Sequence, residues 1–296
     1  MMNKLMQTIF IKLTKFFSRI RRIPIARNIF DFLYFHIYDY LSGIVLIEVQ
    51  GHKMYVDLED TGVVPYLIKD GIYEKYTTEY FKKIVKSGQV VVDVGAMIGY
   101  YTLIAAEIVG ENGKVFAFEP AVDNYNLLIK NIEENGYKNI VPVQKAVSNK
   151  VGTTKLYLAQ KNKGDHRIYD TRNGRSHIEV ETITLDDFFK DEERIDVIKI
   201  DVQGAEYVVL QGMREILRRN SNLKIFVEFW PMGLRRMGYS PEEFLNEFYK
   251  CGFMIYLINE EITPIDKDSL LAMCIDEKFV NLLCMKENCN VAEITK

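Results

Sequence analysis

The sequence predicts an α/β fold built around a mostly parallel sheet, and three observations carry this prediction. Residues 90–94 form a short apolar run that enters a glycine turn and then continues with apolar residues at helical spacing. Residues 115–118 form a second apolar run, which closes a strand–helix–strand unit. Two further strand-like runs, residues 196–200 and 223–227, supply the next parallel strands.

Composition and charge indicate a chain with a sizeable core and bear on which partners it can bind. The chain has 296 residues, of which 48% are hydrophobic and only 7 are proline, so it is long enough to bury a sizeable core. The net charge of -3 conceals an asymmetry, because residues 1–30 contain seven Lys and Arg side chains and no Asp or Glu. Subtracting those seven from the 38 cations leaves 31 against 41 carboxylates, so the rest of the chain is acidic. Nucleic acid is therefore not expected as a partner, since contacts to phosphate need cations.

The cysteines and the apolar segments bear on the cellular location. The four cysteines form no CxxC pair and lie in or near apolar segments: Cys251, Cys274, Cys284 and Cys289. This pattern predicts reduced thiols rather than disulfides, and hence a cytoplasmic location. No run of 18 uninterrupted apolar residues is present, so no segment is expected to span a bilayer.

Residues 1–42 are expected to form a helical extension. Within residues 4–41, bulky apolar side chains recur at helical spacing with lysines and arginines between them. A basic amphipathic helix of this kind is typical of proteins that lie on an anionic membrane surface, here the inner face of the membrane. Packing of the helix on the rest of the chain or on a second subunit explains the pattern equally well. Residues 29–38 contain too few polar side chains for an exposed helix and are expected to be buried.

Residues 43–88 are expected to form a hairpin and a helix that precede the core of the domain. Residues 44–58 alternate in the manner of two strands around Gln50 and Gly51, which suits a tight turn. The helix is expected at residues 78–86.

The glycine turn has the composition of a nucleoside-binding site. Gly95 and Gly99 permit a sharp turn and a close approach to a ligand, because neither carries a Cβ atom. Glu119 ends the next strand, where its carboxylate is placed to accept hydrogen bonds from two ribose hydroxyls. Asp93 would repel a pyrophosphate but suits a ligand with an ammonium or sulfonium charge. The turn therefore favours S-adenosylmethionine over a dinucleotide.

The stretch that follows predicts the remaining elements. A helix is expected at residues 122–135 and a strand at residues 140–144. Strands at residues 153–159 and 178–185 enclose a polar loop, residues 161–168, which is expected to shape a substrate pocket. The segments FMIYLI and FVNLLCM are expected to close the sheet as an antiparallel pair.

Three blocks of the sequence resemble the signature blocks of the FkbM family of S-adenosylmethionine-dependent methyltransferases. The blocks are VDVGAMIGYYT, FAFEP and IKIDVQGAE, in this order along the chain. The resemblance implies a class I, Rossmann-like three-layer sandwich with a mostly parallel seven-stranded sheet and an antiparallel last strand. The methyltransferase core is then expected at residues 89–286, and residues 287–296 are expected to be a frayed tail.

The resemblance also implies which residues hold S-adenosylmethionine: Asp93, Gly95, Ala96, Gly99, Tyr100, Glu119, Pro120, Ala146, Val147 and Asp201. Within this set, Ala146 and Val147 are implied to contact the adenine. Tyr73 and Glu74 match an aromatic-acidic segment that often flanks the cofactor in this family, although an ordinary surface turn explains them equally well. Gln203 departs from the family pattern, which typically has Glu at this position, so no acid–base role is expected there.

Four residues are candidates for deprotonating the acceptor: Asp201, Glu206, Glu228 and His166. A hydroxyl is a poor nucleophile without a base beside it, and it must be aligned with the methyl group. Asp201 is the leading candidate because it ends a strand beside the cofactor. Asp165, His166 and Arg167 offer a base, a proton shuttle and an anion contact. A divalent metal is compatible with two acidic strand ends, but it is not favoured because magnesium needs more ligands than these.

These residues favour an S-adenosylmethionine-dependent methyltransferase, and the resemblance implies O-methylation of a hydroxyl on a glycan, glycolipid or secondary metabolite. The acceptor is expected to be a small molecule, a glycan or a lipid-linked compound. Two alternatives stay open. A nicotinamide-dependent oxidoreductase is disfavoured by the glycine spacing and by Asp93, and a non-catalytic binding protein with the same fold is distinguished only by an activity assay.

Overall fold

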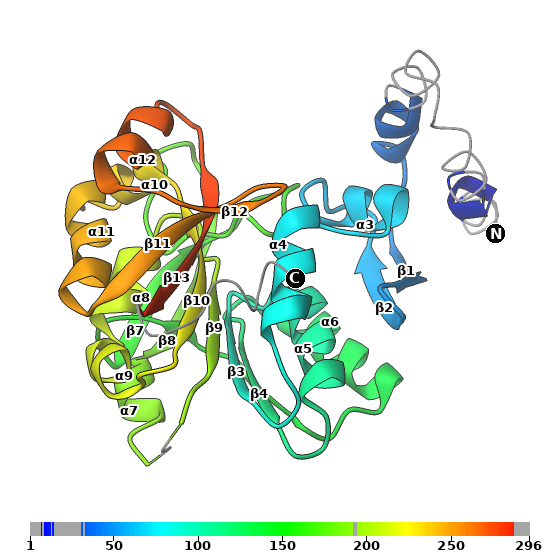
Figure 1. Ribbon diagram of the computed structural model, residues 1–296. Helices are drawn as coiled ribbons and strands as arrows, with labels where there is room; N and C mark the ends of the chain where they lie inside the picture. The colour runs from blue at the N-terminus through cyan, green and yellow to red at the C-terminus, as the bar shows by residue number, and fades with distance from the viewer. Residues whose placement is uncertain are drawn as a thin grey trace.

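The computed structural model describes residue 7, residues 9–12, residue 14, residue 31, residues 33–191 and residues 194–286. Its main feature is an eight-stranded sheet with the strand order β12-β11-β13-β10-β9-β3-β4-β5 (Figure 1). The strands of this sheet are β3 (Val90–Val94), β4 (Lys114–Phe118), β5 (Ile140–Val143), β9 (Val197–Ile200), β10 (Lys224–Phe229), β11 (Phe253–Ile258), β12 (Ile262–Pro264) and β13 (Val280–Lys286).

Strand direction follows the expectation from the sequence. The five strands from β10 to β5 pair in parallel, and β13 pairs antiparallel with both β10 and β11. The predicted antiparallel closing pair is therefore confirmed. The sheet has one strand more than the seven expected, because the three-residue β12 pairs antiparallel with β11 and adds a short edge. Three residues are too few to form an alternating pattern from which a strand can be predicted.

Helices cover both faces of the sheet, which makes three layers (Figure 1). Val91 in β3 packs with α4 and α5, whereas its neighbours Val92 and Val94 pack with α7, α8 and α9 on the opposite face. The helices are α3 (Val64–Asp70), α4 (Lys75–Ile84), α5 (Tyr100–Val109), α6 (Val122–Asn135), α7 (Leu185–Phe188), α8 (Glu206–Gln211), α9 (Arg214–Arg219), α10 (Pro231–Arg236), α11 (Pro241–Lys250) and α12 (Lys267–Met273).

Two small sheets flank the main one. The first is the predicted hairpin, formed by β1 (Ile44–Val49) and β2 (His52–Asp57). The second has the order β6-β8-β7 and consists of β6 (Ala146–Val147), β7 (Gly152–Tyr157) and β8 (His177–Ile183). The polar loop predicted at residues 161–168 lies between β7 and β8, as expected. Helix α4 begins earlier than predicted, at Lys75, because Glu74 adopts a left-handed conformation (φ 44°) that starts the helix there.

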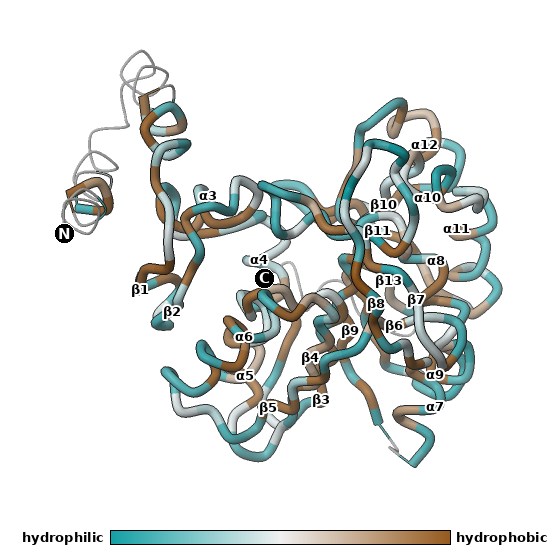
Figure 2. Tube along the Cα trace, turned by 180° about the vertical axis from the view of Figure 1, so that it is seen from behind, coloured by the Kyte–Doolittle hydropathy of each residue, from teal (hydrophilic) through white to brown (hydrophobic). Residues whose placement is uncertain are grey.

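The helical segment before β1 packs on the region around α3. The Tyr34 hydroxyl donates to the Pro65 carbonyl at 2.8 Å, and the Tyr38 hydroxyl donates to the Asp60 carbonyl at 2.8 Å. Phe10 lies against Tyr34 with ring centroids 5.0 Å apart. These contacts confirm that part of the apolar run 29–38 is buried. Figure 2 shows hydrophobic positions along this segment and into β1.

Several expectations about the two ends lie outside the described residues. Most of the basic amphipathic stretch, the whole of the tail 287–296 and Cys289 are among them. The other three cysteines are free thiols. In the part of the chain that the structure describes, no helix is long and apolar enough to cross a membrane.

Candidate active site

The glycine turn after β3 is shaped by contacts within the protein itself. Gly95 has φ 85°, and a Cβ atom there would lie 2.0 Å from the carbonyl oxygen of Asp201. Gly99 has φ 94°, and its Cβ would lie 2.7 Å from a methyl group of Leu128. The sequence correctly predicts the need for glycine. The close neighbour at Gly95 is the β9 end rather than a ligand, so the glycine brings two strand ends together.

A small cavity of about 60 Å³ opens beside the end of β4. Six residues implied by the family resemblance line it: Gly95, Glu119, Pro120, Ala146, Val147 and Asp201. Ala146 and Val147 belong to the two-residue strand β6, and both are buried. Lys145, His166 and Ile168 complete one side. We call this the inner cavity.

Glu119 is held rigidly at the end of β4. One carboxylate oxygen accepts a hydrogen bond from the Met97 amide at 2.9 Å, and the other accepts from the Ala121 amide at 2.8 Å. Burial raises the pKa of Glu119 to about 7, although both amide hydrogen bonds favour the ionised form. Each carboxylate oxygen keeps a second lone pair, so the group can still accept hydrogen bonds from a ribose.

A larger cavity of about 300 Å³ lies on the other side of the glycine turn, and we call it the central cavity. It is lined by six of the predicted cofactor-binding residues and catalytic candidates: Asp93, Gly95, Ala96, Tyr100, Asp201 and Glu228. The inner and central cavities share lining residues: Gly95, Met97, Gly164, Asp201 and Gln203. Asp201 therefore stands where the two cavities meet, as its place at the end of β9 predicts.

Lys199 controls the charge of this junction. Its ammonium is 3.0 Å from the Asp201 carboxylate and 4.4 Å from the centre of the Tyr101 ring. Burial alone would lower the pKa of Lys199, but the carboxylates around it outweigh burial and raise that pKa. Burial opposes ionisation of Asp201 as well, yet the ammonium holds the pKa of Asp201 below its usual value. Lys199 is not among the site residues predicted from the sequence, although a single lysine in an otherwise apolar strand can indicate a buried charge at a functional site.

Burial affects two other carboxyls that line the central cavity, Glu228 and Asp93. Burial raises the pKa of Glu228 well above its usual value, and the negative charge of Asp201 adds to the effect. Burial also raises the pKa of Asp93, which accepts a hydrogen bond from the Thr102 hydroxyl at 2.6 Å. In this cavity the pKa of Asp201 is thus lowered, whereas the pKa values of Glu228 and Asp93 are raised.

Two of the predicted catalytic residues lie apart from this arrangement. Glu206 is fully buried, and one of its oxygens accepts from the amides of Val202 and Gly204 at 3.2 and 3.1 Å. It is not among the residues that line the inner or the central cavity. His166 lines the inner cavity, and its Nδ1 accepts from the Ala159 amide at 3.0 Å. Burial lowers the pKa of His166 to about 4, so its ring is neutral near pH 7.

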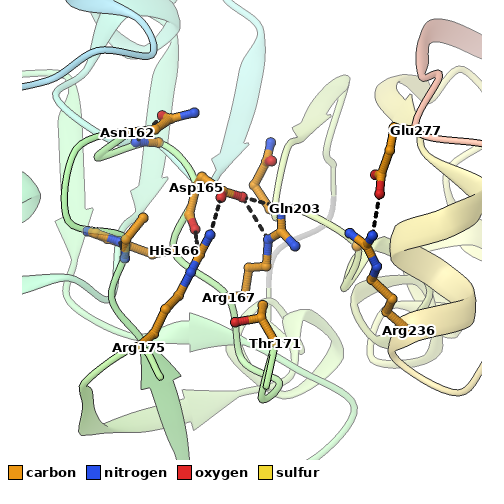
Figure 3. Close-up of polar contacts among 12 residues, drawn as sticks. Asn162, Asp165, His166, Arg167, Thr171, Arg175, Gln203, Arg236 and Glu277 are labelled. Carbon is orange, nitrogen blue, oxygen red and sulfur yellow. Dashed lines mark hydrogen bonds and ion pairs between the residues drawn. The ribbon is translucent and has the colours of Figure 1, made fainter. Parts of the chain in front are cut away.

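The polar loop after β7 is fixed by ion pairs. Asp165 lies between Arg167 and Arg175, and each guanidinium contacts one of its carboxylate oxygens (Figure 3). Arg167 also lies over the Trp230 ring, 4.6 Å from the ring centre. Asp165 and Arg167 both line the central cavity. Asp165 is engaged by two arginines, so it is a structural anchor of the loop rather than a free base.

Tyr73 and Glu74 form part of the site rather than an ordinary surface turn. Tyr73 lines the central cavity. Glu74 accepts hydrogen bonds from the Tyr101 hydroxyl at 2.9 Å and from the Asn281 amide at 2.8 Å. Burial raises the pKa of Glu74, which is also close to Lys199. Among the residues described, no group of three or more His, Cys, Asp or Glu side chains is placed to hold a metal ion.

Comparisons with known proteins find several methyltransferases that this chain resembles. The chain is 30% identical over 202 residues to the methyltransferase sdnD of Sordaria araneosa, covering 55% of this chain and 76% of that protein. It is 24% identical over 177 residues to the hexuronic acid methyltransferase AglP of Haloferax volcanii, covering 59% of this chain and 70% of that protein. Among solved structures, M. jannaschii TYW2 in complex with AdoMet gives a TM-score of 0.45 at 14% identity, covering 82% of this chain and 85% of that one.

The family itself is shown by a match to a domain model. Residues 93–255 match the methyltransferase FkbM domain, which is more than half of the chain. The match begins at Asp93, at the end of β3, and extends into β11, so it spans the strands that carry both cavities. The chain therefore belongs to the FkbM family of methyltransferases, and its methyl donor is S-adenosylmethionine.

Proposed function

We propose that the protein methylates a hydroxyl of a sugar-containing acceptor and that Asp201 is the base. The observation that carries this proposal is the position of Asp201 at the junction of the inner and central cavities, with Lys199 3.0 Å away. Lys199 keeps the carboxylate ionised at neutral pH, as a proton acceptor must be. The names of the relatives support an acceptor of this kind, since AglP is a hexuronic acid methyltransferase.

The residues of the inner cavity fit the adenosine part of the cofactor. Glu119 offers a fixed carboxylate to the ribose hydroxyls, and the apolar pair Ala146 and Val147 offers a flat contact to the adenine. Asp93, Ala96 and Tyr100 would then face the methionine part in the central cavity. The bound cofactor supplies a methyl group on a sulfonium centre, which makes that methyl group electrophilic.

The remaining groups position the acceptor. The raised pKa of Glu228 favours its protonated form, which can donate a hydrogen bond to an acceptor oxygen while Asp201 takes the hydroxyl proton. We assign His166 to the cofactor side because it lines the inner cavity and is already bonded to the Ala159 amide. We assign Glu206 to bracing the turn at residues 202–204, through its two amide contacts.

Calorimetric titration tests the cofactor assignment. S-adenosylmethionine and S-adenosylhomocysteine are expected to bind, and NAD is expected to give no heat. Glu119→Ala is expected to weaken binding of both adenosyl ligands by about tenfold or more, because hydrogen bonds to a charged group are lost. Circular dichroism would verify that the variant is folded. Binding of NAD in place of the adenosyl ligands would contradict the proposal.

A second experiment separates chemistry from binding. Asp201→Asn keeps the size of the side chain but removes the base, so we expect kcat to fall about 10²-fold or more, with little change in S-adenosylmethionine affinity. A variant with normal kcat would show that another group takes the proton.

We further propose that the protein works at the inner face of the membrane. Leu33, Ile37 and Tyr40 are exposed on the segment before β1, and Ile44 is exposed next to them on β1. The seven cations and absent carboxylates of residues 1–30 suit an anionic lipid surface.

Co-sedimentation with vesicles that contain phosphatidylglycerol tests this proposal. Binding is expected at low salt, and it is expected to weaken at high salt and in an Ile37→Asp variant. Equal recovery in the supernatant with and without vesicles would favour packing on protein instead.

A further inference from the structure

A third cavity of about 430 Å³ lies outside the central cavity, and we call it the outer cleft. It shares three lining residues with the central cavity: Gly62, Tyr73 and Phe279. In the described part of the chain, it shares none with the inner cavity. The three cavities therefore lie in sequence, with the Asp201 junction between the inner and central cavities and the outer cleft at the far end.

The order of the three cavities indicates which part of the cofactor or of the acceptor each cavity holds. In the proposed arrangement the adenosine lies in the inner cavity and the methionine part reaches the central cavity, so the outer cleft, which shares no described lining residue with the inner cavity, is left for the acceptor. An acceptor whose hydroxyl reaches Asp201 can extend from the central cavity past Tyr73 and Phe279, which line both spaces. The rest of that acceptor then lies in the outer cleft.

Aromatic rings dominate the wall of the outer cleft. Three of them are conspicuously exposed for their size: Tyr66 at 40%, Tyr76 at 36% and Phe279 at 52%. Such exposure costs free energy in water, so grouped aromatic rings at the mouth of a site usually mark a binding surface. Glu74 and Asn281 lie between them and are bonded to each other at 2.8 Å.

The arrangement of the rings fits a saccharide better than a flat aromatic ligand. Tyr66 and Tyr73 are tilted by 54° at 6.5 Å, so they do not form a parallel slot into which a flat ring could slide. Lysine ammonium groups cover one face of Tyr66 and one face of Tyr76, at 5.5 and 5.3 Å from the ring centres. Both rings remain partly exposed, and their exposed surface suits the apolar C–H face of a sugar, while Glu74 and Asn281 can hydrogen-bond its hydroxyls.

The charges argue against a phosphate or a nucleotide as the occupant. Lys75 is the single cation among the described lining residues of the outer cleft, and Glu74 is a carboxyl there. A phosphate needs several cations or amide donors to replace its water shell. A neutral polyhydroxylated ring needs neither.

We propose that the outer cleft is a saccharide subsite that binds the sugar next to the one that is methylated. The acceptor is then an oligosaccharide, or a glycan chain, rather than a free monosaccharide. This inference rests on the proposed function, because it takes the methylated group to be a sugar hydroxyl near Asp201.

The test uses the full-length protein, tritium-labelled S-adenosylmethionine and glycans released from cells that make the protein. The glycans are separated into mono-, di- and trisaccharide fractions. We expect label in the di- and trisaccharide fractions, with kcat/KM about tenfold or more above that for monosaccharides. Tyr76→Ala and Phe279→Ala are each expected to raise the acceptor KM about tenfold with kcat nearly unchanged.

Two controls accompany these variants. Tyr249→Ala removes a tyrosine of α11 that is 39% exposed and does not line the outer cleft, and it is expected to behave as the wild type. Phe279→Tyr keeps the ring and is expected to restore the wild-type KM. Calorimetric affinity for S-adenosylmethionine is expected to be the same in all of these variants.

The outcomes distinguish the two proposals. Equal labelling of monosaccharides, or unchanged KM in both alanine variants, would overturn the saccharide subsite but leave sugar methylation intact. Absence of label from every sugar fraction, in a protein that binds S-adenosylmethionine, would overturn the proposed acceptor class and the subsite with it.

Discussion

At the scale of single residues, the site depends on how one ammonium is shared among several carboxyls. Lys199 contacts Asp201 directly, and its charge also acts on Glu74 and Asp93. Only the pKa of Asp201 is lowered, whereas burial prevails at the other two and raises theirs. Carboxyls close to one ammonium thereby acquire pKa values shifted in opposite directions, which suits separate roles.

Replacing the lysine tests this assignment. Lys199→Met removes the charge that holds the pKa of Asp201 down, so that pKa is expected to rise. The acid limb of the kcat/KM profile is then expected to move to higher pH by about one unit or more. The measurement is initial rate against pH with S-adenosylmethionine saturating.

Lys224→Met is the matched control, because Lys224 lies in the neighbouring strand β10 and contacts the Asn222 carbonyl at the surface. Its profile is expected to match that of the wild type. Coinciding acid limbs for the Lys199 variant and the wild type would show that Asp201 is not the titrating base.

At the scale of elements, Asp60 joins three parts of the chain. Its carboxylate accepts from the amides of Val63 and Val64 at the start of α3, at 2.8 and 2.9 Å, and from the Lys163 amide of the polar loop at 2.7 Å. Its carbonyl accepts from the Tyr38 hydroxyl at 2.8 Å. The helical extension, α3 and the loop that lines the cavities are therefore fixed to one buried residue.

Removal of this carboxylate is expected to loosen α3 and the polar loop, whereas the hydrogen bond from Tyr38 remains because it goes to the Asp60 carbonyl. Asp60→Ala leaves several buried amides without an acceptor, so we expect a loss of about 2–4 kcal/mol in the free energy of unfolding. Affinity for S-adenosylmethionine is expected to fall too, because residues 162–164 line the cavities. Urea denaturation and calorimetry measure the two effects.

Asp57→Ala serves as the control, since the Asp57 carboxylate accepts one exposed amide hydrogen bond, from Glu59. It is expected to change stability by less than about 1 kcal/mol. Comparable losses in the free energy of unfolding of both variants would show that the Asp60 carboxylate does not hold these elements together.

At the scale of the whole molecule, the buried carboxyls make stability depend on pH. Burial raises the pKa of Glu119 and of Glu206 to about 7, from 4.5 in the unfolded chain. Their stabilising contribution to the free energy of unfolding is fully present below pH 4.5. It is lost as pH rises to about 7, because only the unfolded chain releases these protons between pH 4.5 and 7. His52 and His166 act in the opposite direction, since burial lowers their pKa values.

A difference measurement isolates one of these groups. Glu206→Gln removes its titration, so the variant is expected to gain stability relative to the wild type as pH rises from 5 to 7. The expected gain is about 1 kcal/mol per pH unit in that window. Chemical denaturation of both proteins without cofactor at several pH values provides the test, and parallel pH curves for the two proteins would contradict it.

The parts of this molecule that the sequence predicts well are those with local signals. The turn at Gly95, the strand end at Asp201 and the antiparallel closing strands all follow from short patterns, and the structure has them. The missed or misjudged residues depend on distant contacts. Lys199 acquires its role from carboxyls on other elements, and Glu206 looks available in the sequence but is buried under the turn that it braces.

The outer cleft shows the same limit. Its exposed rings come from residues 66–76 and from residue 279, so no local pattern connects them. The sequence placed Tyr73 and Glu74 near the cofactor only through a family resemblance. Their role beside a third cavity follows from tertiary structure alone.

The Asp60 contacts also have a consequence for how the chain is made. The hydrogen bond from Lys163 to Asp60 joins residues 103 positions apart, so the ribosome must add about a hundred residues before it can form. At common elongation rates this takes on the order of 5–20 s. During that interval Asp60 has only partners that are close to it in the chain, namely the Tyr38 hydroxyl and the amides of Val63 and Val64. The order of synthesis thus lets the segment before β1 and helix α3 dock on Asp60 before the loop that lines the cavities has been made.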